Sequence, residues 1–112
     1  MSCLFCSIVA GDVPAAVVHE TARTLAFRDL NPMAPTHVLV IPRDHHADMA
    51  ALASADPSYA GEVLAAATAV ARQEGLSGGY RLVTNTGDDA GQTVHHLHVH
   101  VLGGRPLGWP PG

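Results

Sequence analysis

The chain has 112 residues, of which 47% are hydrophobic and 14% charged, and this composition predicts a folded domain rather than a disordered chain. Its length predicts a single domain over residues 1–112. The formal net charge of −4 argues against nucleic acid or an anionic membrane as a partner. The sequence has no apolar run of about 18 residues that would span a membrane, and its first residues do not resemble a signal peptide. We therefore expect a cytoplasmic protein.

The first part of the chain predicts one short helix and three strands. Residues 4–10 read as a short helix or turn that stops before Gly11. Two β-type runs at 17–20 and 24–27 suggest a hairpin. Residues 37–41 read as a strand in which 38–41 are all apolar, which indicates a central strand buried on both faces.

The second part predicts the one long helix and two further strands. Asp56 supplies an N-cap for a helix over 57–74, and strands are expected at 80–85 and 94–102, with a loop at 86–91. Strands joined mainly by turns, with a helix inserted, indicate an α+β fold with an antiparallel sheet of about five strands. Aromatic residues make up only 4% of the chain, so a buried dimer interface would help to stabilise so small a core.

Histidine is the unusual residue of this sequence, with eight copies. His96, His98 and His100 alternate with apolar residues, so a strand would place their imidazoles on one face and the apolar side chains on the other. Imidazole can act as nucleophile, acid or base near neutral pH. The alternatives are a solvated strand face and a metal site that uses all three histidines.

The run from His96 to Leu102 resembles the signature of the histidine triad (HIT) family, in which three histidines alternate with apolar residues. The tail, with Gly103-Gly104-Arg105 and Trp109-Pro110-Pro111-Gly112, is similar to the Hint branch, the purine nucleoside phosphoramidate hydrolases. The resemblance extends over further segments, at residues 5–14, 25–32, 34–42 and 91–94. It implies a homodimer whose sheets join into one, and covalent nucleotidyl-histidine chemistry on a purine nucleotide substrate.

The resemblance also implies catalytic roles. His98 would attack the α-phosphorus of a nucleoside 5′-phosphoramidate, His100 would contact a phosphate oxygen, and His37 would join the proton relay. His96 completes the triad, although a His96 bound to metal cannot also be a free acid or base. The alternatives are a dinucleoside polyphosphate hydrolase, a nucleotidyltransferase, or a nucleotide-binding or zinc-stabilised interaction module with little turnover.

The nucleotide contacts follow from the same resemblance. Asp29 would accept hydrogen bonds from both ribose hydroxyls, although an aspartate before Asn31-Pro32 can equally be a turn cap. Phosphate would be held by Asn85, by Thr93 and by the backbone of residues 91–94. The remaining expected contacts are Gln92 and Val94 in that loop and the base walls Ile8, Val13, Phe27 and Leu30, each of which could instead be plain core.

Cys3-x-x-Cys6 is the only cysteine pair. By itself it is compatible with a redox motif, half of a metal site or coincidence. Bacterial HIT proteins with this pair imply a structural Zn²⁺ bound by Cys3, Cys6, His45 and His96, a closed Cys₂His₂ set. The neighbouring His46 is the alternative fourth ligand.

Overall fold

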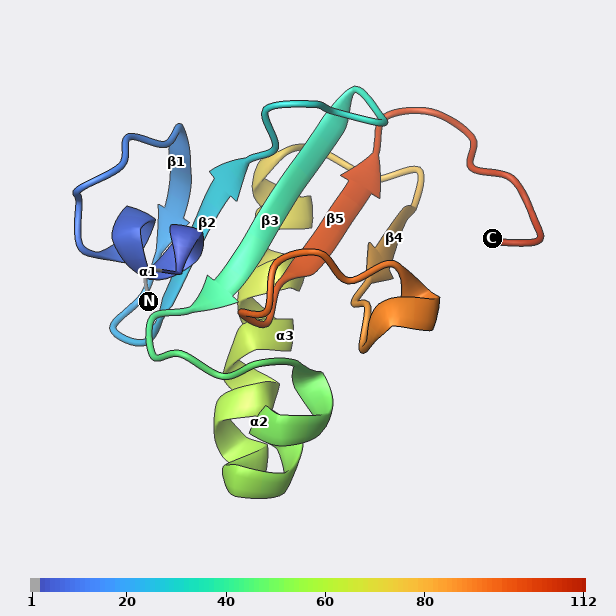
Figure 1. The fold of residues 1–112 in the computed structure, drawn as a ribbon. Helices are drawn as coiled ribbons and strands as arrows, with labels where there is room; N and C mark the ends of the chain where they lie inside the picture. Colours follow the sequence, from blue (N-terminus) through green and yellow to red (C-terminus); the bar gives the residue numbers. More distant parts are fainter. Residues whose placement is uncertain (1–2) are drawn as a thin grey trace.

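The computed structural model describes residues 3–112, which form a sheet with helices on both sides (Figure 1). In chain order the elements are α1 (Leu4–Val9), β1 (Val17–Glu20), β2 (Thr24–Arg28), β3 (Thr36–Pro42), α2 (Met49–Ala55), α3 (Pro57–Gln73), β4 (Tyr80–Val83), a 3₁₀ turn (Asp88–Ala90) and β5 (Val99–Gly103). Within the described residues, no helix has the length and apolar character needed to cross a bilayer.

The five strands form one antiparallel sheet in the order β1-β2-β3-β5-β4. The predicted α+β class and five-stranded antiparallel sheet are therefore confirmed. β3 lies at the centre and all of its residues are buried, as its uninterrupted apolar run predicted. β1 and β4 are the two edges of the sheet.

The long helix α3 covers one face of the sheet (Figure 1). It begins at the predicted cap, where the Asp56 side chain accepts a hydrogen bond from the Tyr59 amide at 3.1 Å. Its buried residues pack against the apolar side chains that alternate along β3 and β5, and together these residues form the larger core cluster, which includes Val38, Val40, Val63, Val70, Leu97, Val99 and Val101.

The opposite face carries a smaller core under α1, built from Phe5, Leu25, Phe27, Leu39 and Ile41. Because Leu39 pairs with His100 across β3 and β5, the two side chains lie on the same face of the sheet. The alternation that sends Val99 and Val101 towards α3 therefore turns His100 towards α1.

Two expectations were wrong in detail. The last strand begins at Val99 rather than at residue 94, because the preceding segment is bonded to a loop: the Leu97 amide donates to the carbonyl of His46 at 2.7 Å. The structure also contains a second helix before α3, which the sequence analysis did not predict. This helix, α2, is capped by Asp48, whose carboxylate accepts from the Ala51 amide at 2.8 Å, and it buries Leu52.

Candidate functional site

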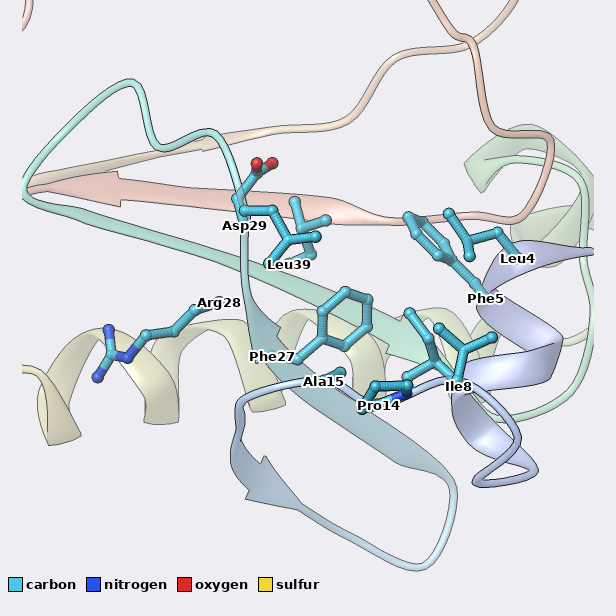
Figure 2. Close-up of a pocket in the computed structure, with 11 residues that line it drawn as sticks. Leu4, Phe5, Ile8, Pro14, Ala15, Phe27, Arg28, Asp29 and Leu39 are labelled. Atoms are coloured by element: carbon cyan, nitrogen blue, oxygen red, sulfur yellow. The ribbon is translucent and has the colours of Figure 1, made fainter.

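An apolar cavity of about 240 Å³ opens between α1 and the sheet (Figure 2). Figure 2 shows α1 side chains forming one wall and strand side chains facing them. The single carboxylate in its lining is that of Asp29, directly after β2. The lining residues are Leu4, Phe5, Ile8, Val13, Pro14, Ala15, Phe27, Arg28, Asp29, Leu30 and Leu39. Leu30 is 98% exposed, so it lies at the rim of the cavity.

A row of imidazoles runs beside this cavity. The rings of His98 and His100 lie 5.0 Å apart, and His37 Nε2 lies 2.9 Å from His100 Nδ1. The row meets the cavity lining at both ends: Phe5 packs edge-on against His98 with ring centroids 5.1 Å apart, and Asp29 Oδ2 lies 3.5 Å from His37 Nε2. A ligand in the cavity would therefore reach the histidines.

The hydrogen bonds of these rings fix which nitrogens carry protons. His98 Nδ1 lies 2.9 Å from the carbonyl oxygen of His96, and a carbonyl can only accept, so Nδ1–H donates. In the neutral ring this leaves a lone pair on His98 Nε2. His37 Nδ1 accepts from the Met33 amide at 3.0 Å, so its proton is on Nε2 and is donated to His100 Nδ1. His100 then carries its own proton on Nε2, where it can donate to a ligand.

Burial keeps His100 and His37 neutral. Burial, together with positive charge on His98 and His37, lowers the pKa of His100 from the usual 6.5 to about 4. Burial also lowers the pKa of His37, against the opposing effect of the nearby Asp29 carboxylate. At neutral pH both rings therefore act as hydrogen-bonding groups without charge.

The low pKa of His100 predicts acid-sensitive stability. Below pH 6.5 the unfolded chain protonates this ring, whereas the folded chain does so only near pH 4, so the free energy of unfolding falls as pH decreases through that window. The slope from one such group is at most about 1.4 kcal/mol per pH unit. Urea unfolding at pH 7 and pH 5 should show a weaker pH dependence in His100→Asn than in the unsubstituted protein. Equal dependence would contradict this assignment.

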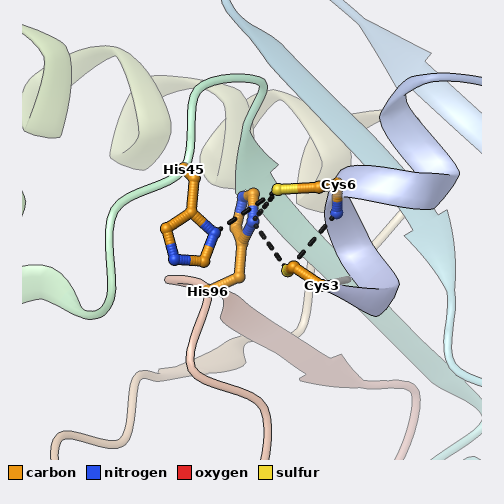
Figure 3. A group of neighbouring side chains, drawn as sticks. All are labelled: Cys3, Cys6, His45 and His96. Carbon is orange, nitrogen blue, oxygen red and sulfur yellow. Dashed lines mark hydrogen bonds between the residues drawn. The ribbon is translucent and has the colours of Figure 1, made fainter. Parts of the chain in front are cut away.

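A second cluster, formed by Cys3, Cys6, His45 and His96, lies where α1 meets the segments before α2 and before β5 (Figure 3). Both cysteines are free thiols, and the four potential ligand atoms lie within 4.8 Å of one another. His96 Nδ1 lies 3.4 Å from the Cys3 sulfur and 3.5 Å from that of Cys6, and His45 Nδ1 lies 3.4 Å from the Cys6 sulfur.

The donor set fits zinc in both type and spacing. Sulfur and imidazole ligands bound to Zn²⁺ at about 2.3 and 2.0–2.1 Å in tetrahedral geometry lie roughly 3.5 Å apart. His96 Nε2 lies 2.9 Å from the carbonyl of Pro42, so Nε2 carries the proton and Nδ1 turns its lone pair to the cysteines. His46 packs on Tyr59 instead, with ring centroids 5.8 Å apart, and does not belong to the cluster.

The polar loop after β4 (Tyr80–Val83) contains the remaining residues that were expected to contact nucleotide. Gln92 is buried, and its side chain accepts from the Gly87 amide at 3.0 Å and donates to the carbonyls of Ala47 and Val94. These bonds stabilise the loop between Gly87 and Val94, and the nucleotide contact of Gln92 stays a prediction. Asn85 and Val94 are half-buried and Thr93 is exposed.

The site also contains residues that the sequence analysis did not single out. Phe5 is 5% exposed, lines the cavity and touches the His98 ring. Thr84 donates its hydroxyl to the carbonyl of His98 at 3.0 Å. The position of Phe5 between two cysteines could have indicated that it belongs to the site. Nothing in the sequence indicated a role for Thr84.

An antiparallel α+β domain whose His-x-His-x-His run places His98 and His100 beside a cavity and His96 in the cysteine cluster has the features of a histidine triad domain. The sequence model of the HIT domain family matches residues 10–107 of this chain. The chain therefore belongs to the HIT family.

The chain is similar in sequence and structure to three further proteins. A HIT family hydrolase of Legionella pneumophila superposes with a TM-score of 0.95 and 47% identity, covering 99% of this chain and 100% of that one. A histidine triad nucleotide-binding protein of Candida albicans superposes with a TM-score of 0.84 and 31% identity, covering 99% and 85% of the two chains. The 14 kDa zinc-binding protein of Zea mays is 46% identical over 97% of this chain and 87% of its own.

Proposed function

We propose that this protein hydrolyses purine nucleoside 5′-phosphoramidates through a nucleotidyl intermediate on His98, as in the Hint branch. The observation that carries the proposal is the hydrogen bond from His98 Nδ1 to the His96 carbonyl, which leaves Nε2 with a free lone pair. A neutral imidazole is nucleophilic without losing a proton first. The names of the hydrolase from Legionella pneumophila and the nucleotide-binding protein from Candida albicans support the same reading.

The proposed reaction has two displacements at phosphorus. His98 Nε2 forms a bond to the α-phosphorus while the phosphorus–nitrogen bond to the amine breaks, and the amine leaves with that electron pair and takes a proton from solvent. Water then attacks phosphorus, the bond to His98 breaks, and the nucleoside monophosphate is released with loss of the water's proton.

The surrounding groups suit both steps. Once phosphorylated, His98 is cationic, and the His96 carbonyl at 2.9 Å from Nδ1 stabilises that charge. His100 Nε2–H is free to donate to a phosphoryl oxygen. Asp29 at the cavity edge offers a carboxylate to the ribose, while the apolar walls accept the base.

We also propose a structural zinc held by Cys3, Cys6, His45 and His96, which fits the donor set and the name of the Zea mays relative. When bound, zinc supplies a crosslink between α1 and two distant segments. In this scheme His96 binds metal through Nδ1 and donates Nε2–H to Pro42, so it is not a proton donor or acceptor in catalysis. Free thiols at both cysteines suit the reducing cytoplasm, which we retain as the proposed location.

The proposal is tested by trapping the intermediate. The protein is mixed briefly with adenosine phosphoramidate, quenched in acid-free denaturant at alkaline pH to preserve the labile phosphorus–nitrogen bond, and analysed by mass spectrometry and peptide mapping. We expect one adenylyl group on the peptide that contains His98. A parallel reaction with a diadenosine polyphosphate distinguishes the alternative substrates by initial rate. Absence of any adduct and of AMP release would contradict the proposed function.

Asp29 provides a prediction about ribose recognition. Its Oδ1 accepts from the Asn31 amide at 2.8 Å, so the residue is a turn cap, and its Oδ2 lies 3.5 Å from His37. Asp29→Ala should weaken AMP binding by about 10- to 150-fold, the loss expected for hydrogen bonds to a charged acceptor of roughly 1.5–3 kcal/mol. Binding of 2′,3′-dideoxy-AMP, measured by calorimetry, should change little.

Asp29→Asn is the matched control for that turn. The amide oxygen can keep the bond to Asn31 while the second acceptor is lost. We expect weaker AMP binding in Asp29→Asn with an unchanged melting temperature. An equal loss for AMP and the dideoxy nucleotide in both variants would leave Asp29 as a turn residue only.

We propose that two copies pair through β4. This strand is a sheet edge, its Tyr80 is 41% exposed, and the half-buried Leu76, which follows α3, lies beside it. An edge strand with an apolar neighbour favours pairing with a second copy about a twofold axis. Sedimentation at micromolar concentration should give a dimer that Tyr80→Glu weakens. Val17→Glu on the opposite edge, where Val17 is 45% exposed, should not. A monomer in the unsubstituted protein would contradict the proposal.

A further inference from the structure

The first turn of α1 belongs to two sites at once. Cys3 is the N-cap residue, and its sulfur accepts from the Cys6 amide at 3.4 Å. Phe5 lies between these two cysteines and, with Leu4 and Ile8 of the same helix, lines the apolar cavity. A helix of six residues is too short to be stable by itself, so its position depends on what holds it to the sheet.

Phe5 connects the two sites by direct contact. Its ring meets that of His98 edge-on, with centroids 5.1 Å apart and planes at 89°, and it also contacts His96 at 6.0 Å and 68°. Its third aromatic neighbour is Phe27 on β2, at 5.4 Å. Phe5 is therefore packed among a metal-site histidine, the proposed nucleophile and a cavity wall.

His96 provides a second connection between the cysteine cluster and the ring of His98. Its Nδ1 faces the two cysteines, while its backbone carbonyl accepts the Nδ1–H of His98 at 2.9 Å. A shift of His96 would move the group that orients His98. Both connections run from the cysteine cluster to His98 and to the cavity beside it.

We infer that metal binding at the cysteine cluster and nucleotide binding beside His98 are cooperative, with Phe5 as the positioning residue that links them. The inference rests on the proposed nucleotide site and extends it. Metal would fix the first turn of α1, which holds Phe5 against His98 and closes the cavity wall; a nucleotide in the cavity would hold the same turn in place for metal. Because coupling is reciprocal, each ligand must raise the affinity of the other by the same factor.

The test measures metal affinity with AMP as the second ligand. Zinc is titrated against a competing chelator with and without saturating AMP, and the Co²⁺-substituted protein reports the same cluster through its thiolate and d–d absorption bands. We expect AMP to raise zinc affinity by about fivefold or more and to perturb the cobalt bands. Zinc affinity that is identical with and without AMP, in a protein that binds AMP, would overturn the inference.

Phe5→Leu and Phe27→Leu form a matched pair. Both remove an aromatic ring from the cavity, but only Phe5 lies between the cysteines. We expect both variants to bind AMP more weakly and to retain all metal ligands. The coupling factor should fall in Phe5→Leu, where only the connection through the His96 carbonyl remains, and stay near its original value in Phe27→Leu. The ¹⁵N shifts of His98, measured in the zinc-bound proteins, should likewise change more in Phe5→Leu.

The outcomes separate this inference from the proposed function. A protein that fails to bind AMP with or without zinc contradicts the proposed function itself. A protein that binds AMP and shows an equal coupling factor in both variants contradicts the role of Phe5. Circular dichroism of each variant with zinc bound establishes that the comparison is made between folded proteins.

Discussion

His98→Ala should abolish the nucleotidyl adduct and reduce phosphoramidate hydrolysis by at least about a thousandfold, as the loss of other covalent nucleophiles does. The physical reason is that no other imidazole lies where it can attack the phosphorus. The ring of His100 lies 5.0 Å from that of His98, and its Nδ1 is engaged with His37 at 2.9 Å, so it presents a proton rather than a lone pair to the cavity. No neighbouring imidazole can therefore take over the in-line attack. Single-turnover kinetics and adduct mapping measure both effects.

The controls for this prediction come from the same histidine run. His95→Ala removes an exposed imidazole three positions away and should leave the rate within about twofold, because surface substitutions away from a site have small effects. His100→Ala should slow the reaction while the adduct still forms on His98. AMP affinity should survive in His98→Ala, since Asp29 and the cavity walls remain. Nucleotide mapped to His96 or His100 would contradict the assignment of the nucleophile.

Much of the fold was predictable because the local signals are strong. The apolar run around β3, the Asp56 cap and the short helix before Gly11 each specify one element, and each is present. α2 was missed because an alanine-rich stretch with one buried leucine shows little periodicity. The start of β5 was misplaced because alternation continues through residues 94–98, and it is tertiary bonding to the loop at His46 that bends this segment away from the sheet.

The site shows the same division between local and tertiary information. Residue spacing brought out the histidine run and the cysteine pair, and the structure brings both cysteines to His45 and His96. Sequence could not show which nitrogen of each imidazole carries the proton, because that depends on carbonyls and amides distant along the chain, such as Pro42 and Met33. It also could not show the hydrogen bonds of Gln92, because one of its partners, Ala47, lies 45 residues away along the chain.

Removal of one cysteine should show how far stability depends on the metal cluster. The free energy of zinc binding becomes folding free energy when the ligands are gathered only in the folded state, and here the ligands come from three distant segments. Cys6→Ser should therefore lower zinc content from about one per chain and lower the melting temperature by on the order of 10 °C or more, given about 4–8 °C for each kcal/mol in a domain of this size. Metal analysis and calorimetry of freshly reduced protein measure these two quantities.

Ser7→Ala is the matched control, since it changes one side-chain group in the same turn of α1 and leaves the four ligands intact. It should keep zinc and shift the melting temperature by only a few degrees. Treatment with a strong chelator should bring the unsubstituted protein to the melting temperature of Cys6→Ser and should have little further effect on that variant. Two results would contradict a structural metal in the cluster: a chelator that lowers the melting temperature of neither protein, or equal melting temperatures for Cys6→Ser and Ser7→Ala. In either case, packing of Phe5 against the sheet is enough to keep α1 in place.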